Sequence, residues 1–596
     1  MPVTDFLERN AKLYPNEVAL VELNPDEKDT RRTSWKEYEL IQPSRFEPYR
    51  REITWGVFNE KANRFANLLL SRGIKKGDKV AILMYNCLEW LPIYFGVLKS
   101  GAIAVPFNFR YDAEEILYCA ELAEVDIIVF GPAFIGRIEA NAEKLSKGRL
   151  LIYVGDGCPD FAESYHELVA DCSSKTPDIP LTEDDYGAIY FSSGTTGFPK
   201  AILHKHQSLT QAAEMEQKHH STGRDDVFLC IPPLYHTGAK FHWMGSLVAG
   251  SKAVLLKGTK PDTILSAVSS EKCTIVWLLV PWAQDILDAL DRGDLKLEDY
   301  ELSQWRLMHI GAQPVPPSLI KRWKEYFPNH AYDTNYGLSE STGPGCVHLG
   351  VENIHKVGAI GVPGYRWQCK IVDEQGVEVK QGEVGELCVK GPGVMTCYYH
   401  NEKATAETLK DGWLYTGDRG YLGEDGSLFV SGRFKSLLIA GDGEKYSPEG
   451  IEEAIAELSP YIDYCVLYNN QSPYTAGLIV PNKTALTEYV KQREEEPGTV
   501  EACKLMLTKL NEELMKFRKG GMYEGMFPER WLPAVVGILP EPLTAQNGTV
   551  NSTSVVRHKV YEVFREELDF LYTPEGKDIR NPRNTKNMKS MITWKI

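Results

Sequence analysis

Hydrophobic residues recur with a helical period in some stretches of the chain and form short uninterrupted runs in others. After Thr54, apolar residues lie three or four positions apart until Gly73, which predicts a helix with Thr54 as its N-cap. The apolar positions of this helix are Trp55, Phe58, Ala62, Phe65 and Leu69. Continuous apolar runs, typical of strands buried on both faces, lie at 80–83, 104–107, 126–130, 150–154, 253–256 and 275–279. Because helical stretches separate most of these runs, the pattern predicts an α/β fold.

Two segments lack such patterning. Residues 23–53 are polar and charged and contain three prolines, so we expect a surface excursion there. The tail from Thr573 to Ile596 carries six basic residues without periodicity. We expect a solvated tail packed loosely on the surface, with binding of an anionic partner as the alternative.

The run from Tyr190 to Lys200 joins a β-branched and aromatic strand to a loop of hydroxyls, glycines and one lysine. Glycines let the backbone approach a ligand closely, and main-chain N–H groups, hydroxyls and an ammonium group neutralise phosphate charge. The Walker A pattern cannot be laid on this run. The run therefore predicts a polyphosphate-binding loop, and a simple surface turn is the alternative interpretation.

This run resembles the phosphate-loop signature of the adenylate-forming superfamily, which includes acyl- and aryl-CoA synthetases, peptide-synthetase adenylation domains and luciferases. Further segments resemble other signatures of the same superfamily, in the same order. They lie at 233–238, 311–314, 333–341, 412–418, 432–436 and 446–452. The resemblance therefore extends along nearly the whole chain.

The resemblance implies a large N-terminal domain of layered β-sheets with helices, residues 1–434, that holds the ATP and acyl sites. It also implies a small mobile α+β domain, residues 435–596, that ends in the basic tail. The family reaction joins a carboxylic acid to AMP from ATP, releases pyrophosphate, and then transfers the acyl group to a thiol, usually of CoA. The implied cofactors are ATP/AMP, Mg²⁺ and coenzyme A.

Site residues follow from the matching positions. The phosphate loop implies Ser192, Ser193, Gly194, Thr195, Thr196, Gly197 and Lys200. The nucleotide positions are Gly311, Ala312, Gln313, Asp333, Asn335, Tyr336, Gly337, Ser339, Asp418 and Arg433. Thr195, Lys200, His236, Glu340 and Lys435 are the catalytic candidates, with Glu340 as the Mg²⁺ ligand and Lys435 as the pivot between domain orientations. Gly441, Gly443 and Glu444 would line the pantetheine tunnel.

Simpler roles remain open for three of these residues. Glu340 could be a solvated carboxylate, His236 a buried core histidine, and Arg433 a partner in a structural salt bridge.

The acyl pocket is expected to be lined by Thr237, Lys240, Phe241, Trp243 and Leu338, together with His236. Acetate-activating relatives carry a tryptophan where this chain has Gly337, so the resemblance implies an acid larger than acetate. The apolar and aromatic lining suits a fatty, alicyclic or aromatic acid.

The chain departs from the family near its C-terminus. A lysine that contacts the carboxylate and the α-phosphate is normal there, and a direct match places Val555 or its neighbour at that position. Three interpretations remain open. Lys559 reaches the site in a shifted register, adenylation is impaired while acyl transfer persists, or the protein binds ligands without catalysis. Reverse operation, which makes ATP from acyl-CoA, is a further alternative, as is a non-CoA acceptor.

Composition narrows the class of protein. A chain of 596 residues exceeds one hydrophobic core, which predicts at least two domains. The net charge of −16 argues against nucleic-acid binding.

The twelve cysteines form no Cys-x-x-Cys and no Cys/His cluster, so neither disulfides nor a structural zinc site is expected. The first residues show no basic region followed by an apolar one, so no secretory signal is expected, and the longest apolar stretch, 274–283, is too short to span a bilayer. We therefore expect a cytoplasmic enzyme without a transmembrane segment, and we predict no particular oligomeric state.

Overall fold

The computed structural model describes residues 1–24, 40–41, 49–192, 199–311, 315, 317–343, 345–349, 356, 359–433, 438–440, 445–446, 448–544, 546–550 and 555–594. The chain divides into two compact units. The first comprises 1–194, 198–416 and 421–429, and the second comprises 195–197, 417–420 and 430–596. The last change of unit, between Phe429 and Val430, falls five residues before the predicted boundary after residue 434.

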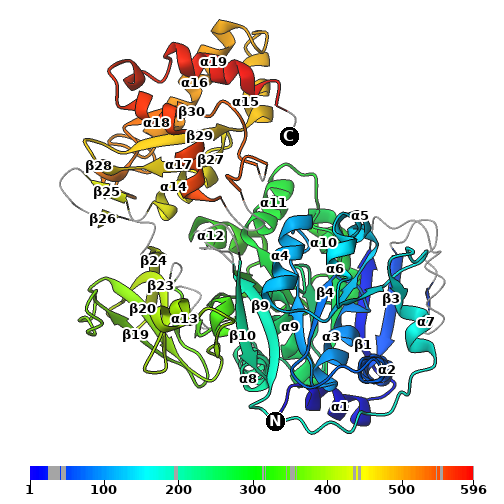
Figure 1. Cartoon of the computed structure of the whole chain (residues 1–596). Coiled ribbons are helices and arrows are strands. Elements are labelled where there is room, and N and C mark those ends of the chain that lie inside the picture. The colour runs from blue at the N-terminus through cyan, green and yellow to red at the C-terminus, as the bar shows by residue number, and fades with distance from the viewer. Residues whose placement is uncertain are drawn as a thin grey trace. The chain divides into compact units, whose positions relative to one another are not determined.

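The first unit contains a sheet with strand order β15-β14-β13-β11-β12-β1-β3-β2. Figure 1 labels β1 and β3 of this sheet. Its strands are parallel from β15 to β1, and β3 and β2 continue it in antiparallel pairing. The bounds are β1 (Val18–Asn24), β2 (Leu40–Ile41), β3 (Tyr49–Thr54), β11 (Val227–Cys230), β12 (Lys252–Leu256), β13 (Ile275–Leu279), β14 (Leu307–Gly311) and β15 (Ala331–Asp333).

A second sheet of the same unit has the order β21-β10-β9-β5-β4-β6-β7-β8. The bounds are β4 (Lys79–Leu83), β5 (Ile103–Pro106), β6 (Ile127–Phe130), β7 (Leu150–Tyr153), β8 (Glu163–Ser164), β9 (Tyr186–Ser192), β10 (Lys200–Lys205) and β21 (Cys397–Tyr398). All six apolar runs noted in the sequence are strands of these two sheets, which confirms the α/β prediction.

The two sheets share one central hydrophobic core. In β4, Val80 and Ile82 belong to this shared cluster, whereas Ala81 and Leu83 belong to a separate cluster on the other face of the sheet. The same alternation divides the residues of the first sheet between the shared cluster and a third one. Both sheets are therefore buried on both faces, which is why their strands read as continuous apolar runs.

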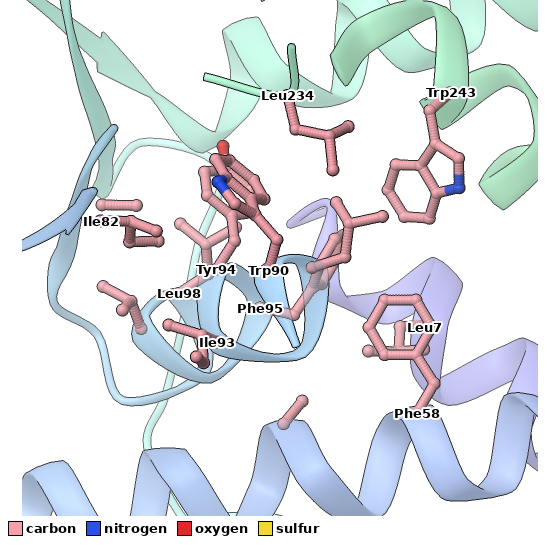
Figure 2. Close-up of a cluster of buried hydrophobic side chains, with 14 of the residues drawn as sticks. Leu7, Phe58, Ile82, Trp90, Ile93, Tyr94, Phe95, Leu98, Leu234 and Trp243 are labelled. Atoms are coloured by element: carbon pink, nitrogen blue, oxygen red, sulfur yellow. The ribbon is translucent and has the colours of Figure 1, made fainter. Parts of the chain in front are cut away.

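Helices fill and cover these layers. They are α1 (Thr4–Leu13), α2 (Trp55–Ser71), α3 (Trp90–Lys99), α4 (Ala113–Leu122), α5 (Ile135–Glu139), α6 (Ala142–Leu145), α7 (Tyr165–Ala170), α8 (His206–His219), α9 (Thr237–Ala249), α10 (Pro261–Glu271), α11 (Val280–Asp291), α12 (Pro317–Tyr326) and α13 (Glu402–Thr408). The predicted helix after Thr54 is confirmed as α2. Thr54 is also confirmed as its N-cap, since Thr54 Oγ1 accepts a hydrogen bond from Val57 N at 3.3 Å. Every residue of α3 is buried, and Figure 2 shows its Trp90, Tyr94 and Phe95 within the shared core.

The prediction of a surface excursion at 23–53 is wrong at both ends of the segment. Residues 23–24 end β1, and 49–53 form most of β3. Arg51 on β3 is 0% exposed, and its guanidinium pairs with Glu22 at 2.6 Å and Glu89 at 2.9 Å. A charged residue in a polar stretch reads as surface, but here two buried carboxylates compensate it. Residues 25–39 and 42–48 lie outside the described part of the chain.

Smaller sheets complete the first unit. One joins β16 (Asn335–Tyr336), β17 (Val347–His348) and β18 (Val362–Pro363). Another has the order β19-β20-β23-β22, with β24 beside β23. Its bounds are β19 (Gln368–Val372), β20 (Gly385–Lys390), β22 (Leu409–Lys410), β23 (Trp413–Leu422) and β24 (Leu428–Arg433). β23 and β24 both contain residues of the second unit.

The second unit is a small α+β body with its own hydrophobic core. Its strands are β25 (Leu438–Ala440), β26 (Lys445–Tyr446), β27 (Ile462–Tyr468), β28 (Asn470–Ser472), β29 (Ala476–Pro481) and β30 (Val535–Ile538). Its helices are α14 (Glu449–Glu457), α15 (Lys483–Lys491), α16 (Val500–Met515), α17 (Arg557–Val563), α18 (Arg565–Leu571) and α19 (Pro582–Met591).

The basic tail does not pack loosely on the surface, so that prediction is wrong for residues 573–594. The tail contains α19, whose Met588 and Met591 enter the core of the second unit. Asn584 bonds the backbone of β30, the edge strand of its sheet, accepting from Ile538 N at 2.9 Å and donating to Val536 O at 3.0 Å. Because buried asparagines supply much of the inner face, the helix shows no apolar period in the sequence.

No helix within the described ranges has the length and apolar character needed to cross a bilayer.

Candidate functional site

The predicted phosphate loop connects two paired strands of the second sheet. Ser192 ends β9 and pairs with Lys200, the first residue of β10. Both side chains are partly exposed at this end of the hairpin. Five of the predicted loop residues lie outside the described part of the chain: Ser193, Gly194, Thr195, Thr196 and Gly197.

Glu340 lies beside the start of this loop. It belongs to a short 3₁₀ turn, Ser339–Ser341, and its Oε1 accepts a hydrogen bond from Tyr398 Oη at 2.8 Å. Tyr398 lies on β21, which pairs with β10, and the Lys200 ammonium is 4.7 Å from the centroid of the Tyr398 ring. The structure therefore brings Lys200 and Glu340 together around a tyrosine that sequence reasoning missed. Nothing in the sequence connects Tyr398 to either residue, because they meet only through strand pairing.

A buried histidine holds the turn that carries Glu340 through a hydrogen bond. His204 Nε2 donates to Ser339 O at 2.8 Å. Burial lowers the pKa of His204 to about 4, so the ring is neutral at physiological pH. A neutral, hydrogen-bonded ring holds the turn without adding charge beneath the phosphate loop.

The predicted nucleotide residues described by the structure surround the carboxyl end of β14. Gly311 ends this strand, and a methyl group added at Gly311 would lie 3.8 Å from Asn335 Oδ1. Tyr336, Gly337 and Ser339 follow Asn335 and are all partly exposed. Ala312 and Gln313 lie outside the described residues.

His236 is not a core histidine, since its side chain is exposed. It caps α9, and its Nδ1 accepts a hydrogen bond from Gly238 N at 3.1 Å. A ring nitrogen that accepts a hydrogen bond carries no proton, so the neutral ring holds its proton on Nε2. His236 therefore presents an N–H donor at the N-terminus of a helix, where negative charge is stabilised.

The predicted pocket residues of α9 do not share one face. Thr237 lies near Leu338. Both Thr237 Oγ1 and Leu338 O are 3.5 Å from the position that a methyl group added at Gly343 would occupy. Trp243 instead packs on Phe58 and Phe95 in the shared core, as Figure 2 shows.

Phe241 and Lys240 are also fully buried. The Lys240 ammonium lies 4.1 Å from the centroid of Tyr190 and has no hydrogen-bond partner among the described residues. Burial lowers its pKa well below the usual value.

The face of α9 toward Asn335 carries His242, which the sequence analysis did not select. His242 belongs to a group of residues that we call the histidine cluster, all of them buried except His219, which is partly exposed: Glu216, His219, His220, His242, His309, Asp333 and His348. Asn335 Nδ2 lies 3.3 Å from His242 Nε2, so the cluster borders the predicted nucleotide residues. Asp333, expected to contact nucleotide, is fully buried inside this cluster.

One local signal for the cluster is visible in the sequence. Glu216 and His220 are four residues apart, which places them on one helical face. Although burial alone would lower it, the charges of Glu216 and Asp333 raise the pKa of His220 to about 10. The other members come from separate strands and from α9, so no spacing in the sequence reveals them.

The remaining predicted site residues belong to the second unit. Asp418 is a buried residue of β23, and Arg433 ends β24. Lys435, Gly441, Gly443 and Glu444 lie outside the described residues. The ribose, pivot and tunnel roles of these residues stay predictions.

The segment that lacks the family lysine is partly described. Val555 forms an isolated β-bridge with Val550, and residues 551–554 lie outside the described part. The Lys559 side chain is 46% exposed and pairs with Glu562 at 2.7 Å on α17. Lys559 is therefore already engaged on the surface of its own helix.

A layered α/β unit that brings Lys200 and Glu340 together, followed in the chain by a small α+β unit, is the arrangement expected of an adenylate-forming enzyme. The family model described as AMP-binding enzyme matches residues 7–399, about two thirds of the chain. The chain therefore belongs to the AMP-binding enzyme family.

Individual relatives agree with this assignment. A feruloyl-CoA synthase of Amycolatopsis sp is 30% identical over 423 residues, which cover 71% of this chain and 81% of that protein. A 2-succinylbenzoate–CoA ligase of Bacillus cereus is 31% identical over 405 residues, covering 68% and 78%. Among solved structures, the anthranilate CoA ligase AuaEII in complex with anthranoyl-AMP superposes with a TM-score of 0.76 at 21% identity, covering 96% of this chain and 98% of that one. This last likeness shows the two-unit fold.

Proposed function

We propose that this protein is an AMP-forming acyl-CoA synthetase that activates a carboxylic acid larger than acetate with ATP and transfers the acyl group to coenzyme A. The observation that carries the proposal is the arrangement of Lys200, Tyr398 and Glu340 at the base of the phosphate loop. Family membership and relatives named as CoA ligases support it.

Glu340 is the proposed ligand for Mg²⁺. Its carboxylate is partly exposed and of the hard oxygen type that Mg²⁺ prefers. A carboxylate offers about four lone-pair sites, and the bond from Tyr398 uses one of them, so the residue fits the ion. When bound, Mg²⁺ would neutralise phosphate charge as pyrophosphate leaves.

The chain's own groups prepare the reacting centre. The Lys200 ammonium is available for phosphate oxygens at the loop, and the Nε2–H of His236 is available for an anion near the start of α9. Such preorganised donors stabilise charge that develops in the transition state. Tyr336 would stack on adenine, and Asp418 and Arg433 would hold the ribose and phosphate region.

The second half-reaction would use the second unit. Lys435 is the proposed pivot, and Gly441, Gly443 and Glu444 are proposed to line the path of the CoA thiol. The absence of a side chain at Gly337 leaves room for the acid. Relatives named for ferulate and 2-succinylbenzoate support an aromatic acid as the first class to test.

Incubation of the purified protein with ATP, Mg²⁺, CoA and a panel of fatty, alicyclic and aromatic acids tests the proposal. We expect acyl-CoA and AMP in equal amounts by mass spectrometry for at least one acid larger than acetate. Glu340→Gln should abolish product formation, whereas Glu139→Gln, a change at an exposed position of the same unit, should not. Pyrophosphate release without acyl-CoA would indicate a non-CoA acceptor, and ATP binding without turnover of any acid or of supplied acyl-AMP would overturn the proposal.

Val555, at the position where the family normally has a lysine, favours a second candidate function. In it, transfer of the acyl group to CoA is faster than adenylation. The protein would then work mainly from acyl-AMP, or in reverse from acyl-CoA, AMP and pyrophosphate. Supplying synthetic acyl-AMP and CoA distinguishes this candidate, because the second half-reaction would run much faster than the complete reaction.

A further inference from the structure

The histidine cluster places nitrogen and oxygen atoms around one carboxylate oxygen. Asp333 Oδ2 lies 3.0 Å from His220 Nε2 and 3.6 Å from His348 Nδ1. His309 offers a ring nitrogen within 4.8 Å of the ligand atoms of both His220 and Asp333. All four residues are at least 98% buried. Two imidazoles and a carboxylate, those of His220, His309 and Asp333, thus converge in the interior of the first unit, and His348 lies beside Asp333.

The hydrogen bonds of the cluster determine which nitrogen of His309 is free to coordinate. His242 Nδ1 must donate to Gly238 O, 2.6 Å away, because a carbonyl oxygen only accepts. In a neutral ring His242 Nε2 then accepts from His309 Nε2 at 2.9 Å. This leaves a lone pair on His309 Nδ1, which is buried and has no hydrogen-bond partner among the described residues. A buried lone pair without a partner points to a ligand.

His220 is oriented in a way that is typical of metal-binding histidines. Its Nδ1 lies 2.5 Å from Glu216 Oε1 and donates a hydrogen bond to that carboxylate. The other nitrogen, Nε2, donates to Asp333 Oδ2 at 3.0 Å when no metal is bound, and an ion at this position would displace that proton and take the lone pair. A carboxylate that accepts the second N–H of a ligating imidazole fixes its tautomer and orientation.

We propose that His220, His309 and Asp333 bind one transition-metal ion of the zinc class. Tetrahedral bonds of about 2.0–2.1 Å place ligand atoms about 3.3 Å apart. His220 Nε2 and Asp333 Oδ2 are 3.0 Å apart, and His309 offers a nitrogen within 4.8 Å of both. The imidazole-rich set excludes Mg²⁺, which prefers oxygen ligands, so this site is distinct from the one proposed at Glu340.

The ion would connect the C-cap residue of α8 with β14 and β15 near Asn335, and it does not depend on the proposed function. The sequence predicts no structural zinc site, because its cysteines lack zinc-binding spacings. The ligands proposed here are histidines and an aspartate spread over more than a hundred residues.

Metal analysis of the full-length protein, purified without a histidine tag in buffers free of added metal and chelator, tests this site. We expect about one zinc ion per chain by mass spectrometry of the metals, or uptake of one Zn²⁺ per chain after chelator treatment. His309→Ala and Asp333→Asn should lose the ion. His206→Gln should keep it, because His206 is another buried histidine of α8 outside the cluster.

Two results would overturn the proposal. The first is a folded wild-type protein that neither contains nor takes up one Zn²⁺ or Co²⁺ per chain. The second is unchanged metal content in folded His309→Ala protein.

If the variants do not fold, X-ray absorption of the zinc-loaded wild type provides the test. It should show nitrogen and oxygen neighbours at about 2.0–2.1 Å. A sulfur shell would place the ion on cysteine and contradict the site.

Discussion

The phenol of Tyr398 donates a hydrogen bond to Glu340 Oε1 at 2.8 Å, and the two residues are 58 positions apart in the chain. Strand pairing makes this contact, because β21 places Tyr398 opposite Ile202 of β10, two residues after Lys200. The hydrogen bond aims the carboxylate, and the ring face lies under the lysine. Tyr398 is thus a positioning residue for the proposed Mg²⁺ ligand.

Tyr398→Phe should weaken Mg²⁺ use while leaving the fold intact. A hydrogen bond to a charged group contributes about 1.5–3 kcal/mol, which corresponds to roughly a 10- to 150-fold loss in adenylation. The measurement is pyrophosphate release as a function of Mg²⁺ concentration, where the half-saturating Mg²⁺ should rise. Tyr399→Phe is the matched control, because its phenol bonds Glu124 on the surface. Equal effects of the two variants would contradict the positioning role.

The sequence predicted the strands well because each is buried on both faces and therefore reads as a continuous apolar run. It failed where polar residues are buried. Arg51, the asparagines of α19 and the histidine cluster all look like surface in a sequence, and only long-range pairing explains their burial. Within the site, motifs identified Lys200 and Glu340, but Tyr398 and His242 contact the site through strand pairing and helix packing that no local pattern encodes.

Arg51→Met should destabilise the first unit strongly. The substitution leaves Glu22 and Glu89 buried without their shared guanidinium, and breaking a buried ion pair in this way costs about 3–5 kcal/mol. Chemical denaturation followed by tryptophan fluorescence measures the loss.

The matched control for this variant is Arg50→Met, the adjacent residue. Arg50 is partly exposed and pairs with Glu271 and Glu52, so its loss should cost much less. A stability loss at Arg51 no greater than that at Arg50 would show that the buried triad contributes little.

His330 should make the first unit less stable in mild acid. Burial against Trp305 and Phe327, and then the charge of Lys324, lower its pKa to about 4, compared with about 6.5 in the unfolded chain. Between these values the unfolded state binds more protons, so stability falls as pH falls from 6.5 to 4 and changes no further below 4.

The lowered pKa of His330 corresponds to a loss of at most about 3 kcal/mol in the free energy of unfolding. Denaturation midpoints measured from pH 7 to pH 4 should therefore fall less steeply for His330→Gln than for the wild type. Identical slopes would mean that His330 is protonated in the folded protein over the same pH range as in the unfolded chain.

Asn584→Ala should destabilise the second unit. The side chain satisfies Ile538 N and Val536 O on the edge strand β30, and its loss leaves buried backbone groups without partners. Each such group costs about 1–3 kcal/mol. Hydrogen exchange should quicken at β30, whereas Lys586→Ala on the exposed face of α19 should change nothing. Unchanged exchange in Asn584→Ala would restore the expectation that the tail packs loosely on the surface.

Val555→Lys should increase adenylation. The substitution supplies an ammonium at the position where the family lysine is missing, and one transition-state donor is worth roughly 10²–10³ in rate. Pyrophosphate release in the absence of CoA measures this step, and acyl transfer from supplied acyl-AMP should change little. Lys559→Ala is the companion variant, because Lys559 is exposed and paired with Glu562 and should be removable without effect. If Lys559→Ala abolishes adenylation and Val555→Lys does not improve it, then Lys559 is the catalytic lysine in a shifted register.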